Sequence, residues 1–543
     1  MSTVSVRALA LLGWLTVIAN LPSCGSSSDS PAANGGAGAG GTSSGGSGTH
    51  AAGTTANAGA NNGGAGTSAN AGSNGDAGAA GAAEAAPDPC PAFTGTPDPG
   101  QALCSWLAGK SPGQQVGQDP TAAALPASAA LAVAGDFVGS IDFGDGVITD
   151  KPIADPPLTT NGPSVFLSEF DDHGRSTRAL AFGTSGSQSV AAMVLDKTGA
   201  AILVGTNTGS VDFGGGALDR VDGGSFIAKF DASRKHVFSR ELNANVVGVG
   251  VDTNGHSHLC GAFAGTANFG GKDLIAGSGQ ALFVAEFDAA GKHVQSVAFS
   301  ATETDAAFGS AAFACATNPT GGMAITGYFR GTFTLPGGKN ISQPGATANG
   351  YLLGLDATQK VIFTQPIPAS GNLWPTPVVF DGSGNVLVTG NANADFDFGD
   401  GVQKAAGKYD LFVAKYSATG SLVKGKLYGD TSDELGLTIT TDSSNTVIVA
   451  GRFGQALTFG TNELTAGSDH DLFLVKFDDT LSPLWSHSFP NGLVFGTKLA
   501  ATADASDNVW LTGNVMGATD FGTGALAIDE PLDRRAFFAK FAP

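Results

Sequence analysis

The chain has 543 residues, and its composition favours many short strands over helices. Gly accounts for 81 residues and Phe for 34, whereas charged residues make up only 14 %. Chains of this kind fold as short strands joined by tight turns, so we expect almost no helix. The formal net charge of −20 argues against a nucleic-acid-binding surface, because phosphate contacts require clustered Lys and Arg.

Residues 1–24 have the features of an export signal. Arg7 precedes an apolar run over residues 8–19, which is too short to span a bilayer and has the length of a secretion-signal core. The run ends in Leu21-Pro22-Ser23-Cys24, which resembles the bacterial lipoprotein signal, although Pro22 stands where a small residue is usual. The resemblance implies cleavage before Cys24 and a lipid anchor on it. The alternatives are an ordinary secretion signal or a retained membrane helix.

Residues 25–86 have the composition of a tether. They contain 18 Gly among 62 residues and no aliphatic residue larger than Ala, no aromatic residue and no Lys or Arg. Such a segment cannot bury enough surface to offset the entropy of ordering it, so we expect it to be disordered. A Gly-rich coil of this length has ends roughly 45 Å apart. We therefore expect a body held away from the outer membrane of the cell envelope, facing the periplasm or the cell surface.

The remainder of the chain repeats one unit seven times. A Gly recurs at fixed places, with an aromatic residue or Leu eight residues after it and, in six units, Asp or Asn nine residues before it. The Gly residues are Gly135, Gly205, Gly261, Gly327, Gly390, Gly451 and Gly513. Their spacings lie between 56 and 70 residues.

Each unit reads as four strands, the second carrying the Gly and the third an aromatic motif such as FVAKY at 412–416. Asp and Gly turns between short apolar runs are typical of antiparallel hairpins. Seven four-stranded units predict an all-β fold, a seven-bladed β-propeller. A β-solenoid is the alternative, but its rungs would repeat every 20–30 residues.

The patterns VxVTGxFxG, DFGxG and FVAKFD resemble the bacterial SBBP-type β-propeller repeat family over residues 119–543. The resemblance implies the fold, but little about activity, since that family is defined by its repeat. The fourth unit departs most from the pattern, with FTLPGG at 333–338 and Gly354 in place of Lys.

The N-terminal segment 87–118 is expected to close the ring. The last unit ends after its third strand, and residues 103–109 (LCSWLAG) stand where a fourth strand would. Closing the last blade with this strand removes the open edge of the sheet. Cys90 and Cys104 flank this region on an exported chain, so we expect them to form a disulfide, with two free thiols as the alternative.

The other two cysteines replace small or apolar residues of the repeat. Cys260 precedes a repeat Gly, and Cys315 lies twelve residues before the next one. We expect two buried free thiols, with a bridge between neighbouring blades as the alternative.

Three motifs carry ligand-type residues, and we assign none of them as a metal or catalytic site. His256, His258 and Cys260 alternate along one strand. The sequence does not name a further ligand that would complete a metal site with the two histidines. Asp142 and Asp145, like Asp397 and Asp400, flank Gly turns; turn capping is the preferred interpretation and calcium the alternative. Matches to a nucleophile elbow at 109–113 and to a phosphate loop at 420–426 lack the required helix.

Residues 119–543 carry 42 acidic and 25 basic side chains. We expect a monomeric binding scaffold for a protein or glycan, without a cofactor and attached to the membrane through its lipid only. The insertions at 147–163 and 300–311 are candidate specificity loops. The alternatives are a structural envelope protein without a discrete ligand and a polysaccharide lyase or hydrolase that uses the central channel.

Overall fold

The structure is a computed structural model that describes residues 89–110, 116–124, 131–144, 147–149, 162–220, 223–302, 311–329, 331–334, 340–343, 349–367, 371–467, 470–490, 498–528, 530 and 533–543. These residues form strands, turns and loops and contain no helix. None of their elements is therefore a helix long and apolar enough to cross a bilayer. The lipidation residue Cys24, the tether 25–86 and most of both insertions lie outside the described residues.

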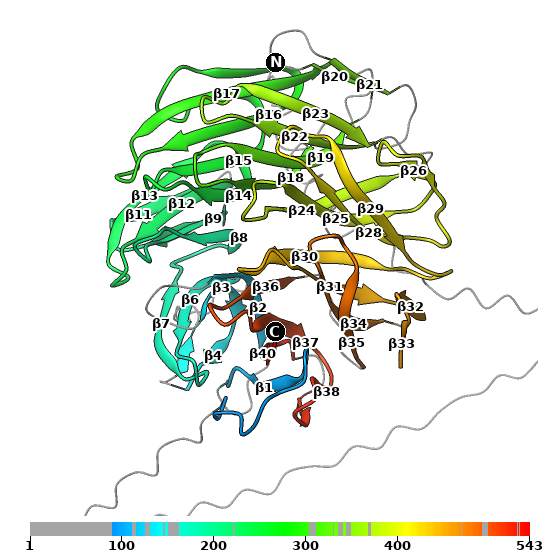
Figure 1. Cartoon of the computed structure of the whole chain (residues 1–543). Coiled ribbons are helices and arrows are strands. Elements are labelled where there is room, and N and C mark those ends of the chain that lie inside the picture. The colour runs from blue at the N-terminus through cyan, green and yellow to red at the C-terminus, as the bar shows by residue number, and fades with distance from the viewer. Residues whose placement is uncertain are drawn as a thin grey trace, which may run out of the picture. The chain divides into compact units, whose positions relative to one another are not determined.

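The long strands form seven antiparallel four-stranded units that follow one another in chain order (Figure 1). From the inside outward, blade 1 is β2 (Gly117–Ala124), β3 (Leu131–Val138), β6 (Ser164–Phe170) and β7 (Ser176–Phe182); blade 2 is β8 (Gln188–Leu195), β9 (Ala201–Asn207), β12 (Gly224–Phe230) and β13 (His236–Leu242); blade 3 is β14 (Asn245–Val251), β15 (Ser257–Ala267), β16 (Leu274–Phe287) and β17 (His293–Thr302); blade 4 is β18 (Ala311–Thr317), β19 (Met323–Phe329), β22 (Asn349–Leu355) and β23 (Val361–Ile367).

The remaining blades repeat this order. Blade 5 is β24 (Leu373–Phe380), β25 (Val386–Ala392), β28 (Asp410–Tyr416) and β29 (Leu422–Tyr428); blade 6 is β30 (Leu435–Thr441), β31 (Val447–Phe453), β34 (Asp471–Phe477) and β35 (Pro483–Phe489); blade 7 is β36 (Leu499–Ala503), β37 (Val509–Val515), β40 (Arg535–Phe541) and β1 (Ala102–Leu107). Each innermost strand contacts the innermost strand of the next blade, and β36 contacts β2. The ring is therefore closed, and the predicted seven-bladed β-propeller is confirmed.

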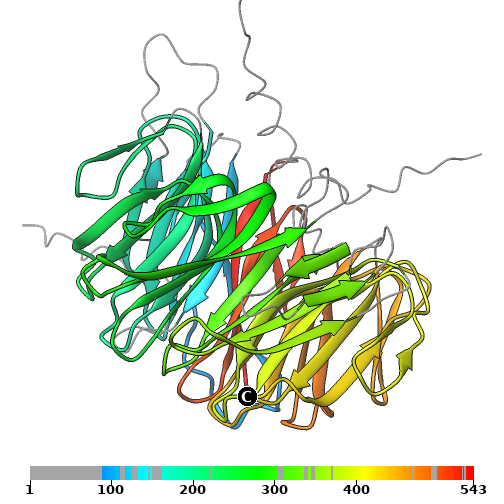
Figure 2. The ribbon, with the colours of Figure 1, turned by 90° about the horizontal axis from the view of Figure 1, so that it is seen from above.

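Short hairpins that the sequence analysis did not foresee connect the second and third strands. They are β4 (Ser140–Asp142) with β5 (Val147–Thr149), β10 (Ser210–Asp212) with β11 (Ala217–Asp219), β20 (Gly331–Thr334) with β21 (Asn340–Gln343), β26 (Phe396–Asp397) with β27 (Val402–Gln403), β32 (Ala456–Phe459) with β33 (Asn462–Thr465), and β38 (Thr519–Asp520) with β39 (Ala525–Leu526). In blade 3 the strands β15 and β16 are themselves longer. The hairpin of blade 4 pairs with β17 of blade 3, whose long green strands are prominent in Figure 2.

The fixed spacing from the repeat Gly to the downstream Phe has a packing cause. A Cβ on Gly451 would lie 1.8 Å from the Leu435 carbonyl oxygen and 2.8 Å from the ring of Phe473 on the neighbouring strand. That ring in turn packs against Phe459 of the hairpin, with centroids 5.8 Å apart. Gly, strand aromatic and hairpin aromatic thus form one stack, which recurs around Gly205 and Gly261.

The N-terminal strand closes the last blade as predicted. β1 pairs antiparallel with β40 at the outer edge of blade 7. Trp106 stacks on Phe538 of β40 at 5.2 Å and also meets Phe170 of blade 1 edge-on at 6.1 Å. One aromatic side chain therefore joins the first and last blades.

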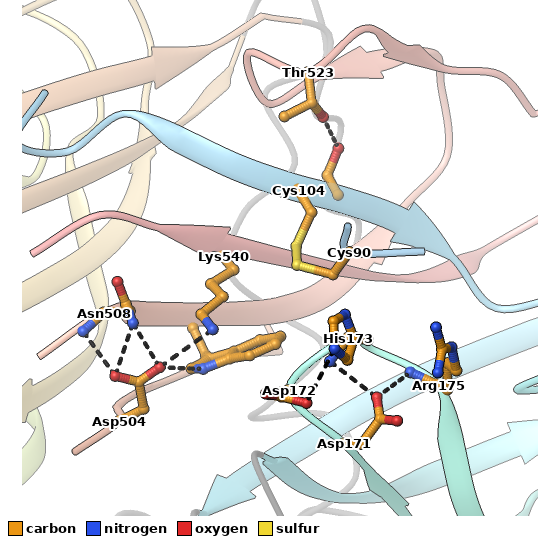
Figure 3. The surroundings of a disulfide bond; sticks show 12 residues. Cys90, Cys104, Asp171, Asp172, His173, Arg175, Asp504, Asn508, Thr523 and Lys540 are labelled. Atoms are coloured by element: carbon orange, nitrogen blue, oxygen red, sulfur yellow. Dashed lines mark hydrogen bonds and ion pairs between the residues drawn. A yellow bond between two sulfur atoms is a disulfide. The ribbon is translucent and has the colours of Figure 1, made fainter. Parts of the chain in front are cut away.

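The disulfide Cys90–Cys104 holds this strand, which confirms the second part of the prediction (Figure 3). Cys90 donates its N–H to the carbonyl oxygen of His173 in blade 1 at 2.9 Å. Ser105 of β1 bonds Thr523 of blade 7 through their hydroxyls at 2.6 Å, so the segment is fixed to both blades.

The expectation of free thiols at the other two cysteines is wrong. Cys260 on β15 and Cys315 on β18 form a disulfide that joins the second strand of blade 3 to the innermost strand of blade 4. Gly248, which is paired with Cys260, leaves the necessary space, because a Cβ there would lie 2.9 Å from the Cys315 sulfur. Cys260 is buried as expected and Cys315 is partly buried, and the ring brings them together from neighbouring blades.

Removing the closing strand should destabilise the ring more than removing its disulfide. The disulfide spans 14 residues and contributes about 3 kcal/mol in the chain-entropy treatment. A chain that starts at Gly117 also loses the Trp106 contacts and exposes the edge of β40. We expect its free energy of unfolding in urea to fall well below that of the Cys90→Ser/Cys104→Ser variant. A truncated chain that unfolds with the intact protein and stays monomeric would contradict this.

Candidate functional site

Asp turns gather at one end of the blades, where the first strand of a blade joins the second and the third joins the fourth. We call this end the turn face. In the turn of Asp196, one carboxylate oxygen accepts the N–H groups of Thr198 and Ala200 at 2.9 and 3.0 Å. The same pattern recurs around Asp252, Asp381, Asp442 and Asp504 between the first two strands, and around Asp231, Asp288, Asp356 and Asp478 between the last two.

In four blades the second oxygen of the inner-turn Asp binds a Lys of the third strand. The pairs are Lys229–Asp196 at 3.2 Å, Lys415–Asp381 at 3.0 Å, Lys476–Asp442 at 2.9 Å and Lys540–Asp504 at 3.5 Å. Burial alone would raise the pKa of Asp381, but hydrogen bonds from Asn385 and Lys415 hold that pKa below its ordinary value. The Lys of the FVAKF motif therefore neutralises a largely buried carboxylate.

Blade 3 breaks this charge balance. Glu286 occupies the Lys position of its third strand, and Asp252 still occupies the turn. The strand β15 and the turn before it add His258 and His256. Ligand-type atoms of Asp252, His258 and Glu286 all lie within 4.8 Å of one another, and all three residues are buried.

The distances between these groups are short. Glu286 Oε1 lies 2.7 Å from His256 Nδ1, while Asp252 Oδ2 lies 3.5 Å from His258 Nε2 and 3.9 Å from His256 Nδ1. Gln295 donates an N–H to the other oxygen of Glu286 at 2.6 Å and fixes that carboxylate. The Nε2 atom of His258 has no hydrogen bond, although the residue is only 2 % exposed.

The electrostatics favour an ionised carboxylate and a neutral imidazole. Burial would raise the pKa of Asp252, but the N–H groups of His256 and Asn254 and the two imidazoles together lower it. Burial lowers the pKa of His258 despite the neighbouring Glu286 and Asp252. An ionised carboxylate and a neutral imidazole are the forms that coordinate metal ions.

The sequence analysis identified only part of this cluster. It singled out His256, His258 and Cys260, but the structure places Cys260 in a disulfide and adds Asp252 and Glu286 instead. The signal that could have found Glu286 is the change from FVAKF to FVAEF at 283–287.

The hairpin carboxylates considered for calcium act as turn caps. Asp397 accepts the N–H groups of Gly399 and Gly401 at 2.7 and 2.9 Å, and Asp142 accepts that of Gly144 at 2.8 Å. Asp145 lies outside the described residues. These contacts match the capping interpretation.

The innermost strands carry short and mostly uncharged side chains. Sequences such as QSVAAMVL in β8, AAFACAT in β18 and LAATA in β36 are typical, and Asp119 in β2 is the one charged residue among the described residues of these seven strands. The inner strands themselves therefore offer few groups for acid–base or metal chemistry.

A cavity of about 300 Å³ lies on the turn face between blades 2 and 3. Its lining includes Lys197, Thr198, Asp231 and Asn254, which supply cationic, hydroxyl, carboxylate and amide groups. Gly255 also lines it and joins the cavity to the turn of Asp252. Its volume is at the lower end of the range for small-ligand pockets.

A second group of buried carboxylates lies where blade 5 meets blade 6. Glu434 is fully buried and accepts hydrogen bonds from the Ser432 hydroxyl at 2.6 Å and the Asp430 N–H at 3.0 Å. Burial raises its pKa to about 7, with Asp430 and Asp410 adding to the effect. Blades 1 and 2 carry Gln118 and Gln188 at the equivalent position.

Glu434 should make stability fall as the pH rises. Its folded pKa of about 7 exceeds the unfolded value of 4.5, so the folded state binds the proton more tightly between these values. The stabilisation that this group contributes is therefore fully present below pH 4.5 and falls by about 3 kcal/mol by pH 8. Urea unfolding should show this slope in the wild type and lose it in Glu434→Gln. The exposed control Glu463→Gln should keep it, and an equal slope in all three proteins would refute the assignment.

No known protein-family profile matches this chain, and no curated protein matches its sequence. Several solved structures are similar to this chain at low identity. A protein of unknown function from Bacteroides caccae is 9 % identical, with 62 % of this chain and 92 % of that chain covered and a TM-score of 0.31. A protein of unknown function from Dyadobacter fermentans is 10 % identical, with coverages of 65 % and 95 % and a TM-score of 0.36.

A variant of the apocarotenoid oxygenase of Synechocystis is also similar. It is 11 % identical, with 79 % of this chain and 97 % of that chain covered and a TM-score of 0.37. At these identities and TM-scores the likenesses carry no argument about this chain, and the resemblance to SBBP-type repeats stays a prediction.

Proposed function

We propose that the protein is a lipid-anchored, extracytoplasmic β-propeller that binds a protein or glycan through its turn face. The proposed location outside the cytoplasm rests on the signal that ends in Cys24 and on the tether at 25–86. Two disulfides support it, because such bonds persist in oxidising compartments outside the cytoplasm. Membrane attachment is through the lipid only, and the acidic charge disfavours nucleic acid as a partner.

The observation that carries the binding role is the cavity between blades 2 and 3, whose apolar wall includes Val237 and Ala289 and whose polar groups stand among them. Its amide, hydroxyl, carboxylate and ammonium groups are the types that bind sugar hydroxyls or peptide groups. The mostly uncharged inner strands disfavour the alternative of a lyase or hydrolase that works in the central channel. A purely structural envelope protein would need no such cavity.

The anchor can be tested by metabolic labelling with a fatty-acid analogue. Lipidation requires the Cys24 sulfur and amino group, so the wild-type chain should incorporate label and sediment with membranes. Cys24→Ser should do neither, while Cys90→Ser, which leaves the signal unchanged, should still be labelled. Labelling that persists in Cys24→Ser would refute the lipid anchor.

The cavity can be tested by calorimetric titration of the purified chain with a panel of envelope oligosaccharides and, separately, with envelope-protein peptides. Lys197→Ala and Asn254→Ala remove two lining groups and should each weaken binding of the best ligand about tenfold, the effect of losing one hydrogen bond to a charged or amide group. Lys424→Ala removes an exposed Lys outside the cavity and should bind normally. Equal affinities in all proteins, or no binding by any probe, would refute the proposed site.

A further inference from the structure

We propose that Asp252, His256, His258 and Glu286 bind one divalent metal ion of the zinc type on the turn face of blade 3. This inference does not depend on the proposed binding function. It begins from charge balance, because four other blades place a Lys against the Asp of this turn. Blade 3 places a second carboxylate there, and a buried pair of carboxylates is stabilised by a compensating positive charge, which a metal ion would supply.

The unpaired nitrogen of His258 is an independent indication. Its Nε2 is buried, makes no hydrogen bond and lies 3.5 Å from Asp252 Oδ2. A Cβ on Gly321 of blade 4 would lie 3.5 Å from the same nitrogen, so the neighbouring turn approaches this side closely. A buried imidazole nitrogen whose nearest acceptor makes no well-formed hydrogen bond is costly unless it has a ligand. A metal ion bound to this atom would remove that cost.

The spacing of the four groups suits a small tetrahedral ion. Ligand atoms around Zn²⁺, with bonds of about 2.0–2.1 Å, lie about 3.3 Å apart. The separations of 2.7, 3.5 and 3.9 Å lie around this value, and the ligand atoms of Asp252, His258 and Glu286 all lie within 4.8 Å of one another, so a bound ion would draw the more distant of them together. Two imidazoles and two carboxylates are a donor set that favours Zn²⁺ over Ca²⁺, which prefers six to eight oxygens.

The two carboxylate ligands are held by neighbouring groups, and the site has access to solvent. Asp252 uses its other oxygen for the turn, which leaves Oδ2 facing the imidazoles. Gln295 fixes Glu286 through the oxygen that does not face His256. The side chain of His256 is 29 % exposed, so the ion can enter and leave beside it.

Zinc titration of the purified, chelator-treated chain tests the site. Calorimetry should show one Zn²⁺ per chain and a higher melting temperature with Zn²⁺, while Ca²⁺ should give neither. Co²⁺ should give the intense visible absorption of a tetrahedral site. No stoichiometric Zn²⁺ binding, or preference for Ca²⁺, would overturn the proposal.

Two variants replace the ligands with residues that other blades already carry. Glu286→Lys restores the Asp–Lys pair, and His258→Leu introduces the residue that blade 5 carries as Leu387. Both should fold, as shown by melting without metal, and should bind Zn²⁺ at least a hundredfold more weakly. His293→Gln, which changes a histidine of the same blade outside the cluster, should bind as the wild type does. Unchanged Zn²⁺ affinity in folded Glu286→Lys and His258→Leu would overturn the proposal.

Discussion

Closure of the ring is the constraint on which the rest of the structure depends. Each blade buries the faces of its strands against its neighbours, as in the aromatic cluster that joins Phe538 of blade 7 to Phe166 and Phe170 of blade 1. A ring that failed to close would leave two such faces in water and one strand edge unpaired. The strand β1 prevents this by binding the outer edge of blade 7, while Trp106 also reaches blade 1.

Closure also explains why the repeats keep some residues and vary others. Every blade must meet the next at a similar angle, so the stack of Gly, strand aromatic and hairpin aromatic recurs at constant spacing. The ends of the blades have more freedom. On the turn face the Asp that caps the turn is kept in five blades, while its partner changes from Lys in four of them to Glu286 in blade 3. Chemistry can therefore differ between blades without altering their packing.

Features that repeat with a fixed period were predictable from the sequence. The blade number, the Asp turns and the closing strand follow from alignment of the units, whereas the Cys90–Cys104 disulfide was inferred from two cysteines outside the repeats on an exported chain. The hairpins were missed because strands of two to four residues have no detectable period. The bridge between Cys260 and Cys315 depends on contact between blades and on the space that Gly248 leaves, which no single unit reveals.

The cluster in blade 3 was identified only in part for a related reason, since Glu286 reaches Asp252 only across paired strands. The two oxygens of Asp252 have different roles: Oδ1 holds the turn through two N–H groups, and Oδ2 faces the imidazoles. Replacing Asp252 would therefore disturb the turn and the cluster together, whereas replacing Glu286 changes the charge beside a turn that keeps its own hydrogen bonds. The third strand is thus the position at which this fold can gain or lose a cation site while retaining its blade.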